Sequence, residues 1–141
     1  MEHHDPDYQK KKNYLGRWLP IRSRMNNVEL RLRELAIDDG VHSSVPKAAA
    51  VMMTSDEYET RTEKAEILQQ RLDHLSTQGK QIRLEIYQVL DELDNATEAG
   101  ILERYFIDGL TQYAIAERLH YSYRWTVRLY TNGIKHISLP D

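Results

Sequence analysis

Residues 109–137 read GLTQYAIAERLHYSYRWTVRLYTNGIKHI, and the spacing within this stretch decides the predicted fold. Thr111 can cap a helix over residues 112–119, because a threonine hydroxyl accepts a hydrogen bond from a free amide at a helix N-terminus. Residues 120–122 follow as a three-residue turn, and the serine that ends the turn can cap a second helix over residues 123–136. The stretch therefore predicts two short helices joined by a tight turn.

Helices joined this tightly cross at a steep angle and need a small residue where they touch. Ala116 is such a residue, and Thr126 and Leu129 stand ten and thirteen positions later, where the second helix should pack back. This spacing is typical of a DNA-binding helix-turn-helix. The stretch departs from the usual pattern in two places: His120 stands where glycine commonly permits a left-handed turn, and Thr126 stands where a β-branched aliphatic residue is common.

Once the inner positions are packed, the helical period places the remaining residues of the second helix outward. An arginine can form two hydrogen bonds to guanine, and valine or threonine methyls can contact the thymine methyl. Tyrosine and serine hydroxyls suit phosphate contacts, which position a protein without specifying sequence. The predicted DNA-contacting residues, with the two arginines foremost, are Gln112, Tyr113, Ser122, Tyr123, Arg124, Val127, Arg128 and Thr131.

Five aromatic residues fall in the same region. We expect at least half of them to pack in the core or in an interface, and we expect Trp125 to pack on a helix over residues 101–107. The five are Tyr113, Tyr121, Tyr123, Trp125 and Tyr130.

The net charge of −3 argues against nucleic acid, but the charge is unevenly distributed along the chain. Residues 1–54 carry +2, residues 55–98 carry −6 and residues 99–141 carry +1. Residues 120–140 hold two arginines and one lysine and no acid. A phosphate backbone responds to such a local patch and not to the sum. The acidic middle is most simply a solvated face; such a segment would also suit keeping the body of the protein off DNA, or binding a basic partner.

Two upstream segments carry a seven-residue apolar repeat, from Tyr14 to Leu35 and from Tyr58 to Leu93. Such a stripe, sustained over several heptads, indicates helices that pack as a coiled coil. Two arrangements fit: an antiparallel hairpin within the chain, or pairing between two chains. The second segment is longer than the first, so part of its apolar stripe has no partner in the first segment. This favours self-association, or packing of that part against the C-terminal region.

Proline and glycine positions set the expected boundaries of these segments. Proline is best tolerated in a first helical turn, and Gly79 either bends the second helix or divides it. The expected elements are a short helix at 9–19, a main helix from Pro20 to Ala36 that ends at Asp38-Asp39-Gly40, a loop over 38–54 with one turn at 47–53, and a long helix over 56–93.

Asn95 or Thr97 can cap one more helix, whose apolar face holds Ile101, Leu102, Tyr105 and Phe106. The predicted class is therefore all-α, a heptad-patterned helical hairpin or coiled coil over residues 1–94 followed by a helix-turn-helix domain over residues 95–141.

The layout resembles the ArpU/RinA-like late-transcription regulators of phages and prophages, whose C-terminal part is similar to region 4 of sigma-70 factors. The resemblance covers most of the chain and is sharpest in RYFIDGLT (104–111) and YSYR (121–124). In that family a glutamate usually precedes the isoleucine of the first motif helix, whereas this chain has Ala114. The resemblance implies sequence-specific DNA binding, activation of phage operons and host RNA polymerase as a further partner.

Other classes of function find little support. The sequence holds no glycine-rich phosphate loop, no nucleophile elbow and no histidine pair at metal-ligand spacing, so neither an enzyme nor a metal or cofactor site is expected. No apolar run reaches membrane-spanning length, no signal peptide is evident and there is no cysteine, so we expect a protein of the bacterial host cytoplasm. The expected partners are double-stranded DNA and a second copy of the chain. The alternative function is a phage assembly, packaging or polymerase-adaptor protein that uses its helices to oligomerise.

Overall fold

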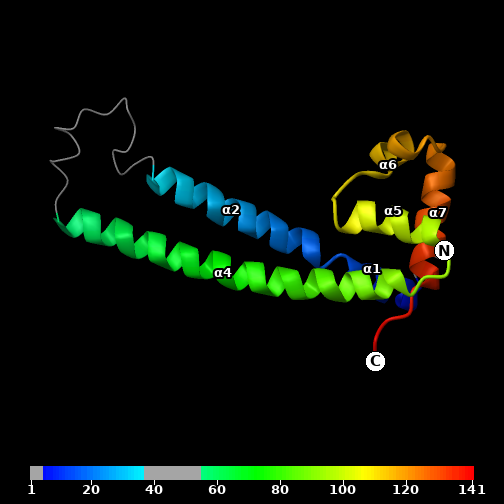
Figure 1. Ribbon diagram of the computed structural model, residues 1–141, viewed down its shortest axis with the longest axis horizontal. Coiled ribbons are helices and arrows are strands. Elements are labelled where there is room, and N and C mark those ends of the chain that lie inside the picture. The colour runs from blue at the N-terminus through cyan, green and yellow to red at the C-terminus, as the bar shows by residue number, and fades with distance from the viewer. Residues whose placement is uncertain (1–4, 37–54) are drawn as a thin grey trace. The chain divides into compact units, whose positions relative to one another are not determined.

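The computed structural model describes residues 5–36 and 55–141, and within them the chain is helical, with no strand (Figure 1). The predicted all-α class is confirmed. The predicted helix end at 38–40 and the loop over 38–54 lie outside the described residues. Two compact units emerge, one of Ile21–Gln78 and one of Met1–Pro20 with Gly79–Asp141, and each is described by itself. The helices are α1 (Pro6–Leu15), α2 (Trp18–Ala36), α4 (Ser55–Asp91), α5 (Ala96–Phe106), α6 (Gln112–Leu119) and α7 (Tyr123–His136).

The break between the first two helices lies closer to the N-terminus than Pro20 led us to predict. Asp5 caps α1 by accepting a hydrogen bond from the Asp7 amide at 3.0 Å, and Pro6 occupies the first turn. The chain breaks after Leu15, at Gly16, and α2 has already begun at Trp18. Pro20 still lies in a first turn, where the missing amide donor leaves no helical hydrogen bond unmade. The predicted short helix and main helix are both present, with the break moved a few residues toward the N-terminus.

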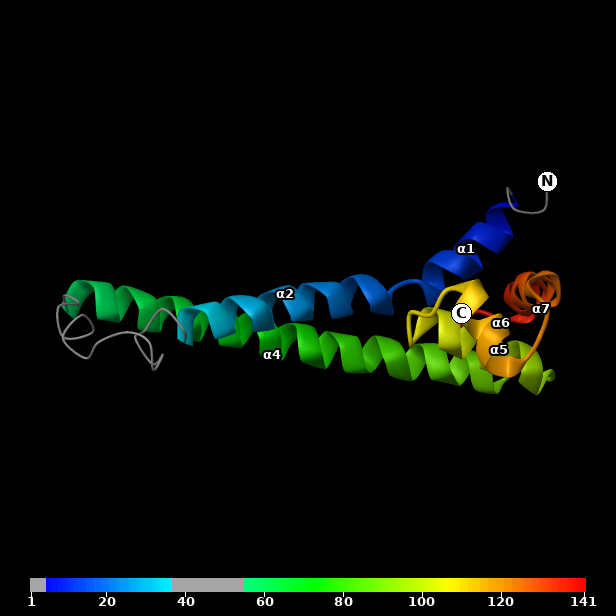
Figure 2. The same ribbon diagram turned by 90° about the horizontal axis from the view of Figure 1, so that it is seen from above.

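In the unit Ile21–Gln78, α2 and α4 run side by side in opposite directions, as both ribbon views show (Figures 1 and 2). Val28 of α2, which is buried, and Leu68 of α4 line the same surface depression. These two residues belong to the two predicted apolar stripes, so the stripes approach each other within the chain at this point. The pairing is incomplete, because several large apolar side chains stay exposed, namely Leu30, Tyr58 and Ile67.

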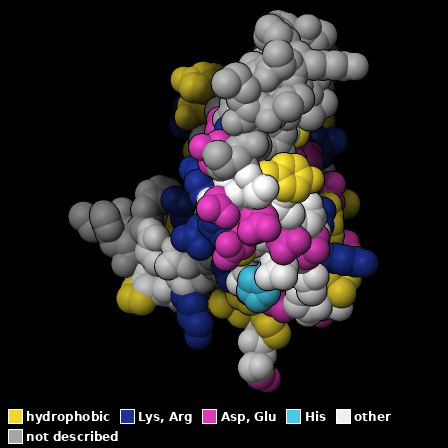
Figure 3. Space-filling model, turned by 90° about the vertical axis from the view of Figure 1, so that its left-hand side faces the viewer, with side chains coloured by type: hydrophobic (Ala, Val, Ile, Leu, Met, Phe, Trp, Pro, Cys, Tyr) yellow, Lys and Arg dark blue, Asp and Glu magenta, His cyan; other side chains and the backbone are white. Residues whose placement is uncertain are grey.

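The polar surface of this part of α4 is acidic. All of its carboxylates over residues 55–78 are exposed, and Figure 3 shows Asp and Glu side chains gathered on the side where α4 begins. Asp56 and Glu57 lie in the first turn, where the helix dipole favours negative charge. The prediction of a solvated acidic face is confirmed for these residues.

α4 continues through Gly79 as one helix, so the expectation that Gly79 divides the helix is wrong. Gly79 is buried. A glycine in a helix interior weakens the helix by about 1 kcal/mol relative to alanine, which is too little to end a helix of 37 residues.

The second unit is built around α5, α6 and α7, and it draws in residues from far upstream. Leu15 of α1, Trp18, and Ile86 and Leu90 near the end of α4 are all buried. The Trp18 indole donates a hydrogen bond to the carbonyl of Ile107 at 3.2 Å. The core of this unit therefore includes residues upstream of residue 95, where the sequence placed a domain boundary. In the structure, residue 95 is the cap of α5 and not the edge of the core. The remaining buried apolar residues of the unit are Tyr8, Val89, Ile101, Leu102, Phe106, Ile107, Ile115, Ala116, Leu129, Tyr130, Ile134 and Ile137.

Candidate nucleic-acid interface

The turn between α6 and α7 is set by local hydrogen bonds. The Thr111 hydroxyl accepts from the Ala114 amide at 3.1 Å and begins α6. α6 ends at His120, whose backbone is left-handed with φ 57° and ψ 39°. The next amide, that of Tyr121, returns to the carbonyl of Ala116 at 2.9 Å. This is the closure that left-handed helix ends commonly use, and it confirms that the histidine takes the place of the usual glycine.

α7 has the bounds predicted from the sequence, Tyr123–His136. The Ser122 hydroxyl accepts from the Trp125 amide at 3.1 Å and so caps the helix. Thr126 is fully buried, and its hydroxyl donates to the Ser122 carbonyl at 3.0 Å. Because the hydroxyl is satisfied locally, threonine fits a position where an aliphatic residue is common.

The inner face of α7 packs closely on α5. Gly133 is buried, and a Cβ placed on it would lie 3.0 Å from Leu102 Cδ1 and 3.3 Å from Glu98 Cβ. The two helix backbones can approach this closely because residue 133 has no side chain. The C-terminal half of α7 is thereby held against a rigid support.

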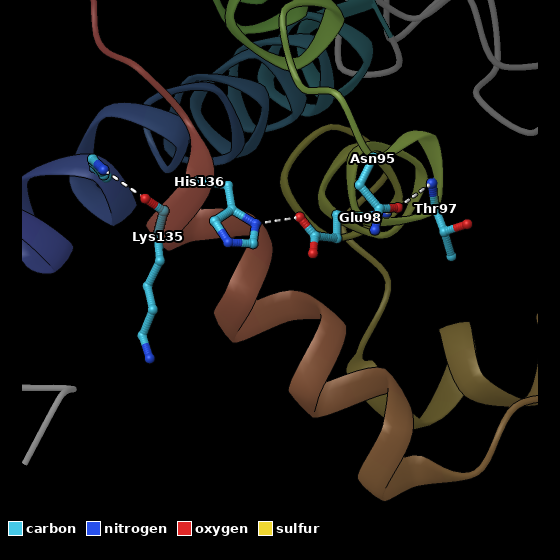
Figure 4. A network of polar contacts seen from close by, with 6 residues as sticks. Asn95, Thr97, Glu98, Lys135 and His136 are labelled. Atoms are coloured by element: carbon cyan, nitrogen blue, oxygen red, sulfur yellow. Dashed lines mark hydrogen bonds and ion pairs between the residues drawn. The ribbon is translucent and has the colours of Figure 1, made fainter.

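A polar contact fixes the C-terminal end of α7 to the start of α5 (Figure 4). Glu98 is buried, and its Oε1 lies 2.7 Å from Nδ1 of His136. The Asn95 carboxamide accepts hydrogen bonds from the amides of Thr97 and Glu98 at 3.0 and 3.1 Å and so caps α5. A buried carboxylate without a partner would be strongly destabilising, so His136, whose own side chain is largely exposed, supplies the polar partner that Glu98 needs.

The first turns of α7 present most of the predicted contact residues at the surface. Tyr123, Arg124 and Arg128 are exposed, and Val127 is half-buried. Neither arginine forms an ion pair with any residue that the structure describes. Both guanidinium groups are therefore available to an external anion, and α7 carries no acidic residue that would oppose one.

The residues predicted near the phosphates gather at the N-terminus of α7. Tyr113 of α6 is 68% exposed and stacks on Tyr123, with ring centroids 4.0 Å apart and planes 8° apart. The Tyr123 hydroxyl lies 3.5 Å from the Gln112 side-chain oxygen. Ser122, already engaged as the cap, completes the group. The structure thus brings Gln112, Tyr113, Ser122 and Tyr123 together.

Thr131 departs from its predicted place on the exposed face. It is half-buried, and its side chain forms a hydrogen bond with the Tyr8 hydroxyl of α1. Burial is the main cause that raises the pKa of Tyr8 above its ordinary value. The sequence pattern of α7 could not reveal this contact, because α1 lies more than a hundred residues upstream.

The aromatic prediction was wrong at Trp125. That side chain is 45% exposed, and Tyr130 packs on α5 in its place, 4.8 Å from the Tyr105 ring and 5.8 Å from the Phe106 ring between centroids. Of the five aromatic residues, the structure buries Tyr130 and leaves the other four exposed. The helical period could have indicated this, because position 130 lies four residues after Thr126 on the buried stripe, whereas position 125 lies about 100° away from Thr126.

The described residues were also searched for a metal site and for a membrane-spanning helix. Within 5–36 and 55–141 there is no group of three His, Cys, Asp or Glu side chains that could hold a metal ion. A search of the same residues finds no helix with the length and apolarity needed to cross a membrane.

Comparison with protein-family models, with curated proteins and with solved structures finds no match.

Proposed function

We propose that this chain is a sequence-specific DNA-binding transcription regulator of phage or prophage type, in which α6, its turn and α7 form a helix-turn-helix and α7 enters the major groove. The observation that carries the proposal is the outer surface of the first turns of α7. There, Arg124 and Arg128 are exposed on a helix without acidic residues, whose opposite face is anchored in the core.

The geometry of α7 suits a duplex. In helix-turn-helix proteins the first turns of the second helix contact base edges. Arginine is the side chain that most often reads guanine, through two hydrogen bonds. The stacked rings of Tyr113 and Tyr123 place a hydroxyl-bearing surface beside the arginines, where phosphate contacts would set the register.

The resemblance to ArpU/RinA-like regulators supports a role in late phage transcription, with host RNA polymerase as a partner. The C-terminal likeness to region 4 of sigma-70 factors points to promoter DNA as the target.

A second copy of the chain is part of the proposal. One recognition helix binds weakly, and paired motifs read two half-sites about one helical turn apart. The large apolar side chains of Leu30, Tyr58 and Ile67 on α2 and α4 are exposed and so offer apolar surface that a second copy could cover.

Selection of bound duplexes from a random-sequence pool tests the proposal without knowledge of the target. We expect enrichment of one motif, repeated with its centres about 10 base pairs apart. Light scattering on the same preparation reports the oligomeric state. Recovery of no motif, together with a ring or larger oligomer, would instead favour the assembly or adaptor function.

A further inference from the structure

The lysine tract Lys10-Lys11-Lys12 lies on α1, and the fold carries α1 onto α7. Tyr8 and Leu15 of α1 are buried, and the Tyr8 hydroxyl reaches Thr131 of α7. The Lys11 ammonium donates to the carbonyl of Lys135 at 2.7 Å, next to the end of α7. A cation there is favoured by the helix dipole, so Lys11 holds the two helices together.

The other two lysines of the tract are not used in this contact. Lys10 is exposed and Lys12 is half-buried, and neither forms an ion pair with any residue in the described ranges 5–36 and 55–141. Neighbouring positions on a helix are about 100° apart. Lys10 and Lys12 therefore project to the two sides of Lys11.

The acidic residues at the start of α1 are engaged locally. Asp5 accepts the Asp7 amide as the helix cap, and the Asp7 carboxylate lies 3.4 Å from the Lys11 ammonium. With three lysines and one aspartate on α1, and two arginines, one lysine and no acid on α7, the two helices together carry +5. The rest of the chain carries −8, since the whole chain is −3.

We propose that α1 is a second DNA-contacting element, in which Lys10 and Lys12 bind the phosphate backbone of the same duplex that α7 reads. This inference rests on the proposed function.

The dimensions of α7 support the assignment. With 14 residues, α7 is about 21 Å long at 1.5 Å per residue, whereas the major groove is about 12 Å wide. When the first turns lie in the groove, the C-terminal half extends past the groove edge, where phosphates run. α1 packs on that half, at Thr131 and Lys135.

The salt dependence of binding separates a phosphate contact from other effects. Each phosphate that a lysine neutralises adds about 0.9 to the slope of log affinity against log salt. We compare the wild type with K10A/K12A, with the charge-retaining K10R/K12R, and with K64A/K80A, which removes two exposed lysines of α4. Each protein is titrated against a pool-selected duplex by fluorescence anisotropy from 50 to 200 mM salt, after circular dichroism has checked its helicity.

We expect K10A/K12A to lower the slope by about 0.9 for each lysine in contact, and thus by about 0.9 to 1.8. Over this fourfold salt range, the wild type would then lose about 3- to 12-fold more affinity than the variant. K10R/K12R should retain the wild-type slope, and K64A/K80A should leave it within error.

Equal slopes for K10A/K12A and K64A/K80A would overturn the inference while leaving duplex binding by α7 intact. A wild-type protein with no salt-dependent duplex binding would overturn the proposed function and this inference with it.

Discussion

Replacement of Gly133 by alanine probes the close approach of α5 and α7 that positions the proposed recognition helix. An alanine Cβ would meet Leu102 Cδ1 at 3.0 Å and Cγ at 3.2 Å, whereas carbon atoms prefer about 3.5–4.0 Å. Leu102 is fully buried, so it has no free space into which to turn. Either α7 shifts by about 0.5 Å, or Leu102 leaves its preferred rotamer.

Two opposing free-energy terms decide whether G133A raises or lowers the free energy of unfolding. Alanine is about 0.8–1.0 kcal/mol more favourable than glycine inside a helix. Overpacking a core typically destabilises by about 1–3 kcal/mol. We therefore expect G133A to lower the free energy of unfolding by about 1 kcal/mol, within a range of about 0–2 kcal/mol.

Gly100 of α5 supplies the matched control. Its added Cβ would meet the end of the flexible Arg104 side chain, with Nη1 at 3.1 Å, and a guanidinium can move aside. G100A should therefore raise the free energy of unfolding by up to about 1 kcal/mol.

The assay is urea unfolding followed by the fluorescence of Trp18, which is buried in the same compact unit, in a Trp125→Phe background. If G133A stabilised the protein as much as G100A does, the close helix approach at residue 133 would be refuted.

Three further predictions test the caps, the aromatic surface and the core. Asn95→Ala should lose about 1 kcal/mol of stability because two amides of α5 lose their acceptor, whereas Asn95→Asp should retain most of it; urea midpoints decide, and equal losses would count against the cap. Duplex DNA should change the tryptophan emission of the wild type but not of Trp125→Phe, because Trp125 is 45% exposed on α7 whereas Trp18 is buried; an unchanged wild-type emission would show that duplex binding leaves the surroundings of Trp125 as they are. Burial raises the pKa of Tyr130 well above its ordinary 10.0, so its contribution to stability is complete below pH 10 and falls as the unfolded state ionises at higher pH. Tyr130→Phe should flatten that fall in the urea midpoint, and an unaltered pH profile would contradict the assignment.

Much of the local structure was predictable because it depends on short-range chemistry. Asn95, Thr111 and Ser122 cap the helices that their positions suggested, and α6 and α7 have the predicted bounds. His120 adopts the left-handed turn expected there. Each of these features is decided by hydrogen bonds within a few residues, which a sequence displays directly.

Contacts between distant segments were not predictable in the same way. Tyr8 covers Thr131, and the Lys11 ammonium reaches the Lys135 carbonyl across 124 positions. Apolar spacing shows that α1 has a face to bury, but it does not identify the partner. The burial of Glu98 was missed because a carboxylate reads as solvated unless its partner, His136, is known.

The central claim, that α7 reads duplex DNA through its first turns, is tested most directly by comparing two double variants on a pool-selected duplex. R124A/R128A removes the exposed arginines of α7, and R31A/R33A removes two exposed arginines of α2. If each α7 arginine reads a base, the pair contributes about 2–6 kcal/mol, so the Kd should rise at least about 25-fold with relaxed sequence preference. R31A/R33A should bind within about twofold of the wild type at 150 mM salt, where screening limits distant charges. Equal affinity and unchanged sequence preference in R124A/R128A would contradict the claim.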